Sequence, residues 1–162
     1  MNKPLLILFL ACTLAAPAIA SAPVAVQANP NHDQLLTSKN AHVAANKRLV
    51  YDFWREVLEA GHLELADKYL AESYIQHNPS VPTGRAGFVA FFSQFAKPKP
   101  IDAHIKAPLV SVVAEGDLVV LSFVNELPDP KDPAKKYTTT AFDMFRIEGG
   151  KIAEHWDGET KR

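Results

Sequence analysis

Residues 142–157 read FDMFRIEGGKIAEHWD, and this stretch decides the fold. Polar and apolar residues alternate on both sides of Glu148-Gly149-Gly150, a pattern typical of two strands joined by a tight turn. Together with the residues that precede it, the stretch predicts one strand over residues 137–147 and another over residues 151–157.

Two further strands are expected upstream of this hairpin. Residues 105–113 and 118–124 are rich in β-branched and apolar side chains, and Glu115-Gly116-Asp117 between them is a turn signal. A polar loop marked by prolines, over residues 128–136, then leads into the next strand. The carboxy-terminal part is therefore expected to form an antiparallel meander.

The part of the chain before residue 101 has helical periodicity instead. A helix from Asn40 to Gly61 is expected because apolar residues recur there at spacings of three and four, namely Val50, Phe53, Trp54, Val57 and Leu58. A short second helix is expected around Leu65, Ala66, Tyr69 and Leu70. A third helix is expected to begin near Gly84 and to end before Pro98, with one aromatic face formed by Phe88, Phe91, Phe92 and Phe95.

These elements indicate an α+β fold in which three amino-terminal helices pack on a curved, mainly antiparallel sheet. The helices carry more aromatic residues than a flat packing layer needs, so we expect the sheet to curve round them and form a cone. Such a cone leaves an open mouth that suits a small apolar ligand. Its expected lining is aromatic and consists of Phe53, Trp54, Tyr74, Phe88, Phe92, Phe145 and Trp156.

The amino terminus is expected to direct export. Residues 1–20 combine Lys3, a short apolar run and Ala18-Ile19-Ala20, which is the pattern of a signal peptide. Cleavage is expected after Ala20, with Ala22 or Ala28 as later options, and it would yield a periplasmic or secreted protein.

Two alternatives to a cleaved signal stay open. The segment could remain as a membrane anchor, although its apolar run is shorter than a membrane-spanning helix requires. It could instead belong to a lipoprotein that is modified at Cys12. In each case, a flexible leader is expected over residues 21–39 and a single domain over residues 40–160.

Composition excludes several classes of protein. The chain has 162 residues, of which 48% are hydrophobic and 22% charged, and this is ordinary for one packed domain. The formal net charge of −1 shows no basic excess, so we expect no nucleic-acid partner. Cys12 is the single cysteine, and the 6 histidines have no metal-ligand spacing. We therefore expect neither a metal nor a cofactor.

Asp143 is the strongest catalytic candidate. Alternation along its strand places it on one face with Thr139, Ala141 and Phe145. A carboxyl group among apolar side chains is costly unless it is paired or used, and burial tunes such a group for general acid–base catalysis. The opposite face, with Phe142 and Met144, is also apolar, so Asp143 could instead lie on the surface.

His77 and His155 are the second pair of candidates, because histidine changes its charge near neutral pH. His77 lies between the second and third helices and could equally form hydrogen bonds that stabilise a loop. His155 shares a strand face with Asp157, and the two could be an acid–base pair or a solvated strand end.

Two segments, Tyr74-Ile75-Gln76-His77-Asn78-Pro79 and residues 142–157, resemble the SnoaL-like polyketide cyclases of the nuclear transport factor 2-like superfamily. The resemblance covers about residues 42–158 and implies a cone-shaped fold, frequent homodimers and an aldol condensation that needs no metal or cofactor. The family's acid–base aspartate falls on Asp143, in a D-x-x-R context with Arg146. Its assisting histidine is expected in the strand through residues 125–127, where this chain has Asn-Glu-Leu.

Three functions are compatible with these observations. In the first, Asp143 removes a proton next to the carbonyl of a small apolar compound, and His77 or His155 donates to the oxyanion. In the second, the same cone binds an apolar molecule without catalysis. In the third, the domain mainly dimerises through its sheet. The mature protein is expected to be a homodimer that does not insert into membranes.

Overall fold

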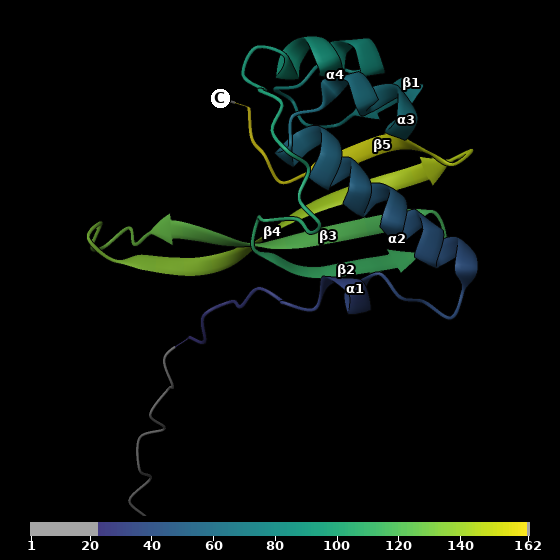
Figure 1. Ribbon diagram of the computed structural model, residues 1–162. Coiled ribbons are helices and arrows are strands. Elements are labelled where there is room, and N and C mark those ends of the chain that lie inside the picture. Colours follow the sequence, from purple (N-terminus) through teal and green to yellow (C-terminus); the bar gives the residue numbers. More distant parts are fainter. Residues whose placement is uncertain (1–22, 162) are drawn as a thin grey trace, which may run out of the picture.

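The computed structural model describes residues 23–161, which form helices packed on one face of a curved, open five-stranded sheet (Figure 1). The strands are β1 (Leu70–Gln76), β2 (Leu109–Glu115), β3 (Leu118–Pro128), β4 (Lys136–Glu148) and β5 (Lys151–Asp157). Their order in the sheet is β1-β5-β4-β3-β2. Strands β2 to β5 pair antiparallel, and β1 pairs parallel to β5. The α+β fold with a mainly antiparallel sheet is thus confirmed.

The longest helix, α2 (Ala41–Phe53), lies across the sheet and continues as a π-helical segment, η1 (Trp54–Glu59) (Figure 1). It begins where the side chain of Asn40 accepts hydrogen bonds from two backbone N–H groups of the first turn. The predicted end at Gly61 is confirmed, since this glycine has a φ of 76°. A Cβ there would lie 2.8 Å from the carbonyl oxygen of Lys97, so the close approach also requires glycine.

The shorter helices are α1 (His32–Leu35), the 3₁₀ turn η2 (Leu63–Leu65), α3 (Ala66–Tyr69) and α4 (Arg85–Phe92). The centre of the core is Phe53 of α2, which is 1% exposed. Its ring lies 5.9 Å from Tyr69, 5.8 Å from Phe88 and 6.1 Å from Phe145. Helices and sheet are therefore joined through one aromatic cluster, and burial of such rings contributes most of the stability.

Several elements differ from the sequence-based expectation, among them β3, which continues to Pro128 instead of ending at residue 124. Strand β1 was not predicted, because the residues before Gln76 do not alternate clearly between polar and apolar. Strand β2 begins only after Pro108, which has no N–H group to contribute to the sheet. Helix α4 ends at Phe92 rather than near Pro98, because the chain turns back and the Lys99 N–H donates to the Ala60 carbonyl at 2.8 Å.

The register of β4 decides which side chains face the helices. Phe145 and Ile147 are 1% and 3% exposed, whereas Phe142 is 58% exposed. Asp143 shares the inward face with Phe145, as strand alternation predicted. The alternative in which Asp143 lies on the outer surface is wrong.

The segment before α2 contacts the sheet in its described part. The backbone N–H groups of Val26 and Asn29 donate to Thr138 Oγ1 and to the Leu109 carbonyl, at 2.8 and 2.7 Å. The side chain of Leu36 is buried in the core. The expected signal peptide, residues 1–20, lies outside the described residues. Between residues 23 and 161, no helix has the length and apolar character required to cross a membrane.

Glu56 is a buried acid that links η1 to α3. Its carboxylate accepts hydrogen bonds from the Tyr69 hydroxyl at 2.5 Å and from Lys68 Nζ at 3.0 Å. Burial opposes ionisation of Glu56, but these two hydrogen bonds and the positive charges of Lys68 and Arg55 together outweigh it and lower the pKa of the carboxyl group below 4.5. Burial and the same carboxylate raise the pKa of Tyr69 to about 12.

This arrangement predicts a stability that depends on pH. Because the pKa of Glu56 is lower in the folded chain, its contribution is complete above pH 4.5 and is lost as the pH falls through the lowered value. In Glu56→Gln, the free energy of unfolding is expected to depend less on pH in this range. Urea denaturation at a series of acidic pH values measures the difference, with the exposed Glu72→Gln as matched control. Equal pH dependence in the Glu56→Gln variant and the wild type would contradict the assignment.

Candidate functional site

A pocket of about 280 Å³ opens between the helices and the strands β1, β5 and β4; we call it the inner pocket. Most of its wall is apolar, and six of the residues expected to line it do so: Phe53, Trp54, Tyr74, Phe88, Phe92 and Phe145. Leu58 and Val81 complete the apolar part. Polar groups gather on the strand side and consist of Gln76, Asn78, Asp143, His155 and Asp157. An apolar pocket with a few convergent polar groups is the usual form of a small-molecule site.

Asp143 and His155 form a close pair of titratable side chains in the inner pocket. Asp143 on β4 is paired across the sheet with Asp157 on β5, which places His155 diagonally beside it. His155 Nε2 lies 3.0 Å from Asp143 Oδ1, and the side chains are only 10% and 17% exposed. Two of the three predicted catalytic residues therefore meet in one pocket.

Gln76 determines which nitrogen of His155 carries a proton. Its Oε1 accepts a hydrogen bond from the Asn78 backbone N–H at 3.0 Å, so this atom is the amide oxygen and not the nitrogen. The same oxygen lies 2.8 Å from His155 Nδ1, which must then be the donor. The proton between Nε2 and Asp143 is consequently shared by the pair, as imidazolium with carboxylate or as imidazole with carboxylic acid.

Tyr74 supplies a hydrogen-bond donor to the same pocket. Its hydroxyl oxygen accepts from Gln76 Nε2 at 3.0 Å, and within residues 23–161 its own proton has no protein acceptor. Burial raises the pKa of Tyr74, and the nearby Asp157 and Asp143 raise it further. The phenol thus stays protonated at neutral pH and can donate to a ligand in the inner pocket.

Asp143, His155 and Asp157 are also the described residues that could hold a metal ion. One ligand atom from each lies within 4.8 Å of the others. These groups already have hydrogen-bond partners, since Asp157 Oδ2 accepts from Asn78 Nδ2 at 2.7 Å and His155 Nε2 faces Asp143. Hydrogen bonds through Gln76 and Asn78 therefore connect these three side chains to one another.

Asp143 and Asp157 line a second, more polar hollow of about 320 Å³ on their other side; we call it the polar hollow. Its wall includes Asn125, Thr140 and Glu159, so the carboxyl groups lie between an apolar compartment and a polar one.

The structure places His77 and Trp156 outside the inner pocket. Their rings stack at 4.7 Å with an interplanar angle of 5°, and His77 Nε2 lies 3.0 Å from Glu154 Oε2. Alternation along β5 explains the separation, because Trp156 and His155 point to opposite faces of the sheet. His77 directly follows Gln76, the last residue of β1, so the alternation along the strand points its side chain toward the outer face of the sheet.

Gln76 and Asn78 were not among the predicted site residues. Tyr74 and Gln76 are two residues apart at the end of β1, so strand alternation puts them on one face of the sheet. Asn78 follows two residues later, just after the strand. The signal was present in the sequence, but it requires β1 to be identified as a strand. Asp157 was noted only as a possible partner of His155.

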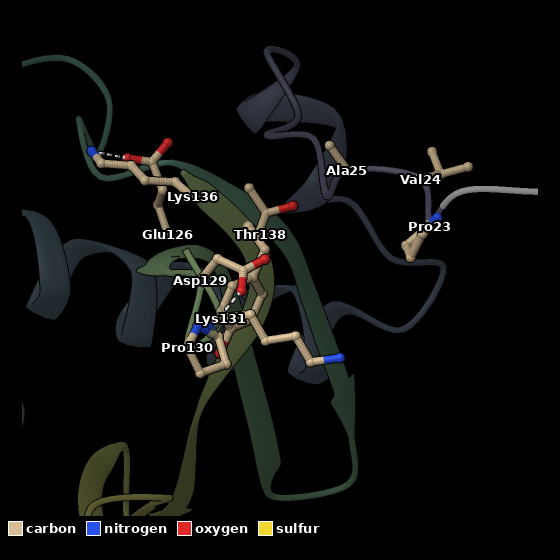
Figure 2. A pocket seen from close by; sticks show the side chains of 10 residues that line it. Pro23, Val24, Ala25, Glu126, Asp129, Pro130, Lys131, Lys136 and Thr138 are labelled. Atoms are coloured by element: carbon tan, nitrogen blue, oxygen red, sulfur yellow. Dashed lines mark hydrogen bonds and ion pairs between the residues drawn. The ribbon is translucent and has the colours of Figure 1, made fainter. Parts of the chain in front are cut away.

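A larger hollow at the other end of the sheet has different chemistry. It has a volume of about 640 Å³ and lies between residues 23–25 and the end of the β3–β4 hairpin (Figure 2). Two of its charged pairs are already formed or bonded: Lys136 pairs with Glu126, and the Asp129 carboxylate accepts from the Lys131 backbone N–H (Figure 2). No acid–base pair lies next to an apolar wall there, so we place the functional site in the inner pocket.

Gln76→Leu is expected to change the tautomer of His155 without unfolding the protein. The variant removes the acceptor of Nδ1–H, so a neutral imidazole is expected to appear that has lost the Nδ1 proton and donates Nε2–H to the Asp143 carboxylate. Nitrogen-15 NMR of histidine-labelled protein distinguishes the two forms, with Gln94→Leu on the surface as control. An unchanged Nδ1–H signature in Gln76→Leu would show that Gln76 does not position His155.

The fold and the site define the class of protein. Helices packed on a curved, open sheet, with an apolar pocket between the two layers, form the α+β cone of the nuclear transport factor 2-like superfamily. Within it, the chain belongs to the family of SnoaL-like domains, whose family model matches residues 50–155. No curated protein matches the sequence significantly.

Solved structures confirm the fold. A protein of Acidithiobacillus ferrooxidans, provisionally assigned as a polyketide cyclase, superposes with a TM-score of 0.50 at 22% identity, over 75% of this chain and 89% of that one. An LEH-like epoxide hydrolase of M. tuberculosis gives a TM-score of 0.51 at 13% identity, over 72% of this chain and 83% of that one. At such low identity the likeness concerns the fold and not the reaction.

Proposed function

We propose that this protein is an exported enzyme that carries out acid–base chemistry, of the aldol or isomerisation type, on a small apolar carbonyl compound without a cofactor. One observation carries the proposal. The hydrogen-bonded pair of Asp143 and His155 lies in a pocket whose remaining wall is mostly aromatic. Export rests on the sequence of residues 1–20, and the mass of the protein recovered from the periplasm tests it.

The site supports the following chemistry. The Asp143 carboxylate removes a proton from the carbon next to the carbonyl, while the Tyr74 hydroxyl donates a hydrogen bond to the carbonyl oxygen, on which negative charge develops. His155 stabilises Asp143 and holds the shared proton. The proton taken by Asp143 then returns to another carbon in an isomerisation, or to the new alkoxide after an aldol step, so the enzyme ends unchanged.

The aromatic wall supports this role by excluding water. Phe88 and Phe145 are 2% and 1% exposed, and Trp54 stacks on Phe123 with ring centroids 4.5 Å apart. Electrostatic interactions are stronger beside such an apolar wall than in water, and the side of a reactive enolate that faces the rings is shielded from protonation by water.

Exchange of α-protons in heavy water tests the proposal without knowledge of the natural substrate. Enolisable aliphatic and aromatic ketones are incubated with the protein, and NMR follows the incorporation of deuterium next to the carbonyl. The expected result is that exchange is faster with the protein than in buffer alone, and that this increase requires Asp143. Binding of these ketones with no exchange would instead establish the non-catalytic ligand-binding domain.

We further propose that two copies of the domain pair through the outer face of the sheet. An apolar row crosses four strands there through direct pairing, from Val113 through Val120 and Met144 to Trp156. Phe142, next to this row on β4, is 58% exposed. Exposed apolar surface of this kind typically marks a protein–protein contact.

Phe142→Glu is accordingly expected to convert a dimer to a monomer, because two like charges would meet at the contact. Sedimentation equilibrium measures the mass of the wild type and the variant, and Phe95→Glu is the control on another face. A wild-type protein that is monomeric at high concentration would contradict the pairing and leave the inner pocket unaffected.

A further inference from the structure

A second pocket of about 330 Å³ adjoins the inner pocket; we call it the outer pocket. Leu58 and Phe92 line both pockets, so the two compartments share one wall. The outer pocket contains none of the acid–base groups of the inner pocket. Its lining adds Phe95 and two basic residues, Lys97 and Lys99.

The apolar surface is continuous from one pocket to the other. The ring of Phe92 lies 4.5 Å from Phe88 in the inner pocket and 5.6 Å from Phe95 in the outer pocket. Phe95 is 58% exposed, which is unusual for so large an apolar side chain beside a pocket. A ligand with an extended apolar body can therefore contact both compartments along this row of rings.

Charge differs at the two ends of the row. The inner pocket contains the carboxyl groups of Asp143 and Asp157. Lys97 and Lys99 line the outer pocket as exposed residues, and within residues 23–161 their side chains form no ion pair. The one acid there, Glu59, accepts from the backbone N–H groups of Lys106 and Ala107 at 2.8 and 2.7 Å.

From this polarity, and resting on the proposed function, we propose that the substrate is an amphiphilic carbonyl compound with an anionic group at the end remote from the reacting carbonyl. An anion placed beside Asp143 and Asp157 would meet two carboxyl groups, whereas in the outer pocket it meets two lysine cations against the single carboxylate of Glu59. The carbonyl end then reaches Tyr74, and the apolar body lies along Phe88, Phe92 and Phe95. The outer pocket thus selects the class and the orientation of the substrate.

Tryptophan fluorescence measures this binding independently of turnover. In a Trp156→Phe background, Trp54 is the only tryptophan and lines the inner pocket. The probes are methyl ketones with alkyl chains of increasing length, each compared with the oxo-acid in which a carboxylate replaces the distal methyl group. At low salt, we expect the best oxo-acid to bind about fivefold to tenfold more tightly than its ketone, the scale of one or two exposed ion pairs.

The lysines are tested with a matched pair of double variants. Lys97→Gln/Lys99→Gln is expected to remove the preference for the oxo-acid and to leave the ketone affinity unchanged. The control Lys131→Gln/Lys161→Gln changes the net charge by the same amount, at two exposed residues outside the outer pocket. It is expected to keep the preference for the oxo-acid over the ketone. Equal affinities of ketone and oxo-acid, no binding of either, or a preference that survives Lys97→Gln/Lys99→Gln would each overturn the proposal. If the preference is present but no ketone exchanges deuterium, the outer pocket still selects anionic amphiphiles, now as ligands and not as substrates, and catalysis is refuted.

Discussion

Asp143→Asn is expected to lower kcat/KM for α-proton exchange about 10²- to 10⁴-fold, the usual contribution of a general base. The amide has the shape of the carboxyl group but cannot accept a proton from carbon. It can still form a hydrogen bond with His155, whose Nε2 lies 3.0 Å from Asp143 Oδ1. The fold is therefore expected to persist while exchange is lost.

Two measurements separate loss of the base from loss of structure. Circular dichroism and urea denaturation follow the fold of Asp143→Asn, and Trp54 fluorescence follows ketone binding. The control is Asp117→Asn, an exposed acid in the turn before β3. Wild-type exchange in a folded Asp143→Asn variant would show that Asp143 is not the base.

Phe53→Ala is expected to cause the largest loss of stability, about 3–5 kcal/mol in the free energy of unfolding. Phe53 is 1% exposed and contacts rings from α3, α4 and β4, so its removal leaves a cavity among helices and sheet that the neighbours cannot fill. Urea denaturation followed by circular dichroism measures the effect.

Phe95→Ala is the matched control for this substitution. It deletes the same atoms from a side chain that is 58% exposed, so the expected loss is well below that of Phe53→Ala. Similar losses in the two variants would contradict the placement of Phe53 at the centre of the core.

The sheet and the inward position of Asp143 could be predicted because strand alternation is a local property of the sequence. Residues 142–157 contain both the turn and the alternation, and the resulting hairpin appears in the structure with Asp143 on the buried face. Helix α2 was predictable for a similar reason, since its apolar residues recur at a helical spacing and Gly61 ends the segment.

The hydrogen-bond network around His155 could not be predicted in the same way. It depends on β1, which lies next to β5 although about eighty residues separate the two strands in the chain. The parallel pairing of these strands places Gln76 opposite His155. His77 was a natural candidate by residue type. Its position one residue beyond Gln76 continues the alternation toward the outer face, where it stacks on Trp156.

The polar hollow on the far side of Asp143 and Asp157 has a kinetic consequence. Because Asp143 and Asp157 line both the inner pocket and the polar hollow, we expect the two carboxyl groups to stay in contact with solvent while an apolar compound occupies the inner pocket. On the proposed function, Asp143 can exchange its hydron with bulk water before the carbon compound leaves. A ketone with several α-hydrogens should then acquire more than one deuterium in a single residence, and doubly labelled product should appear from the earliest time points.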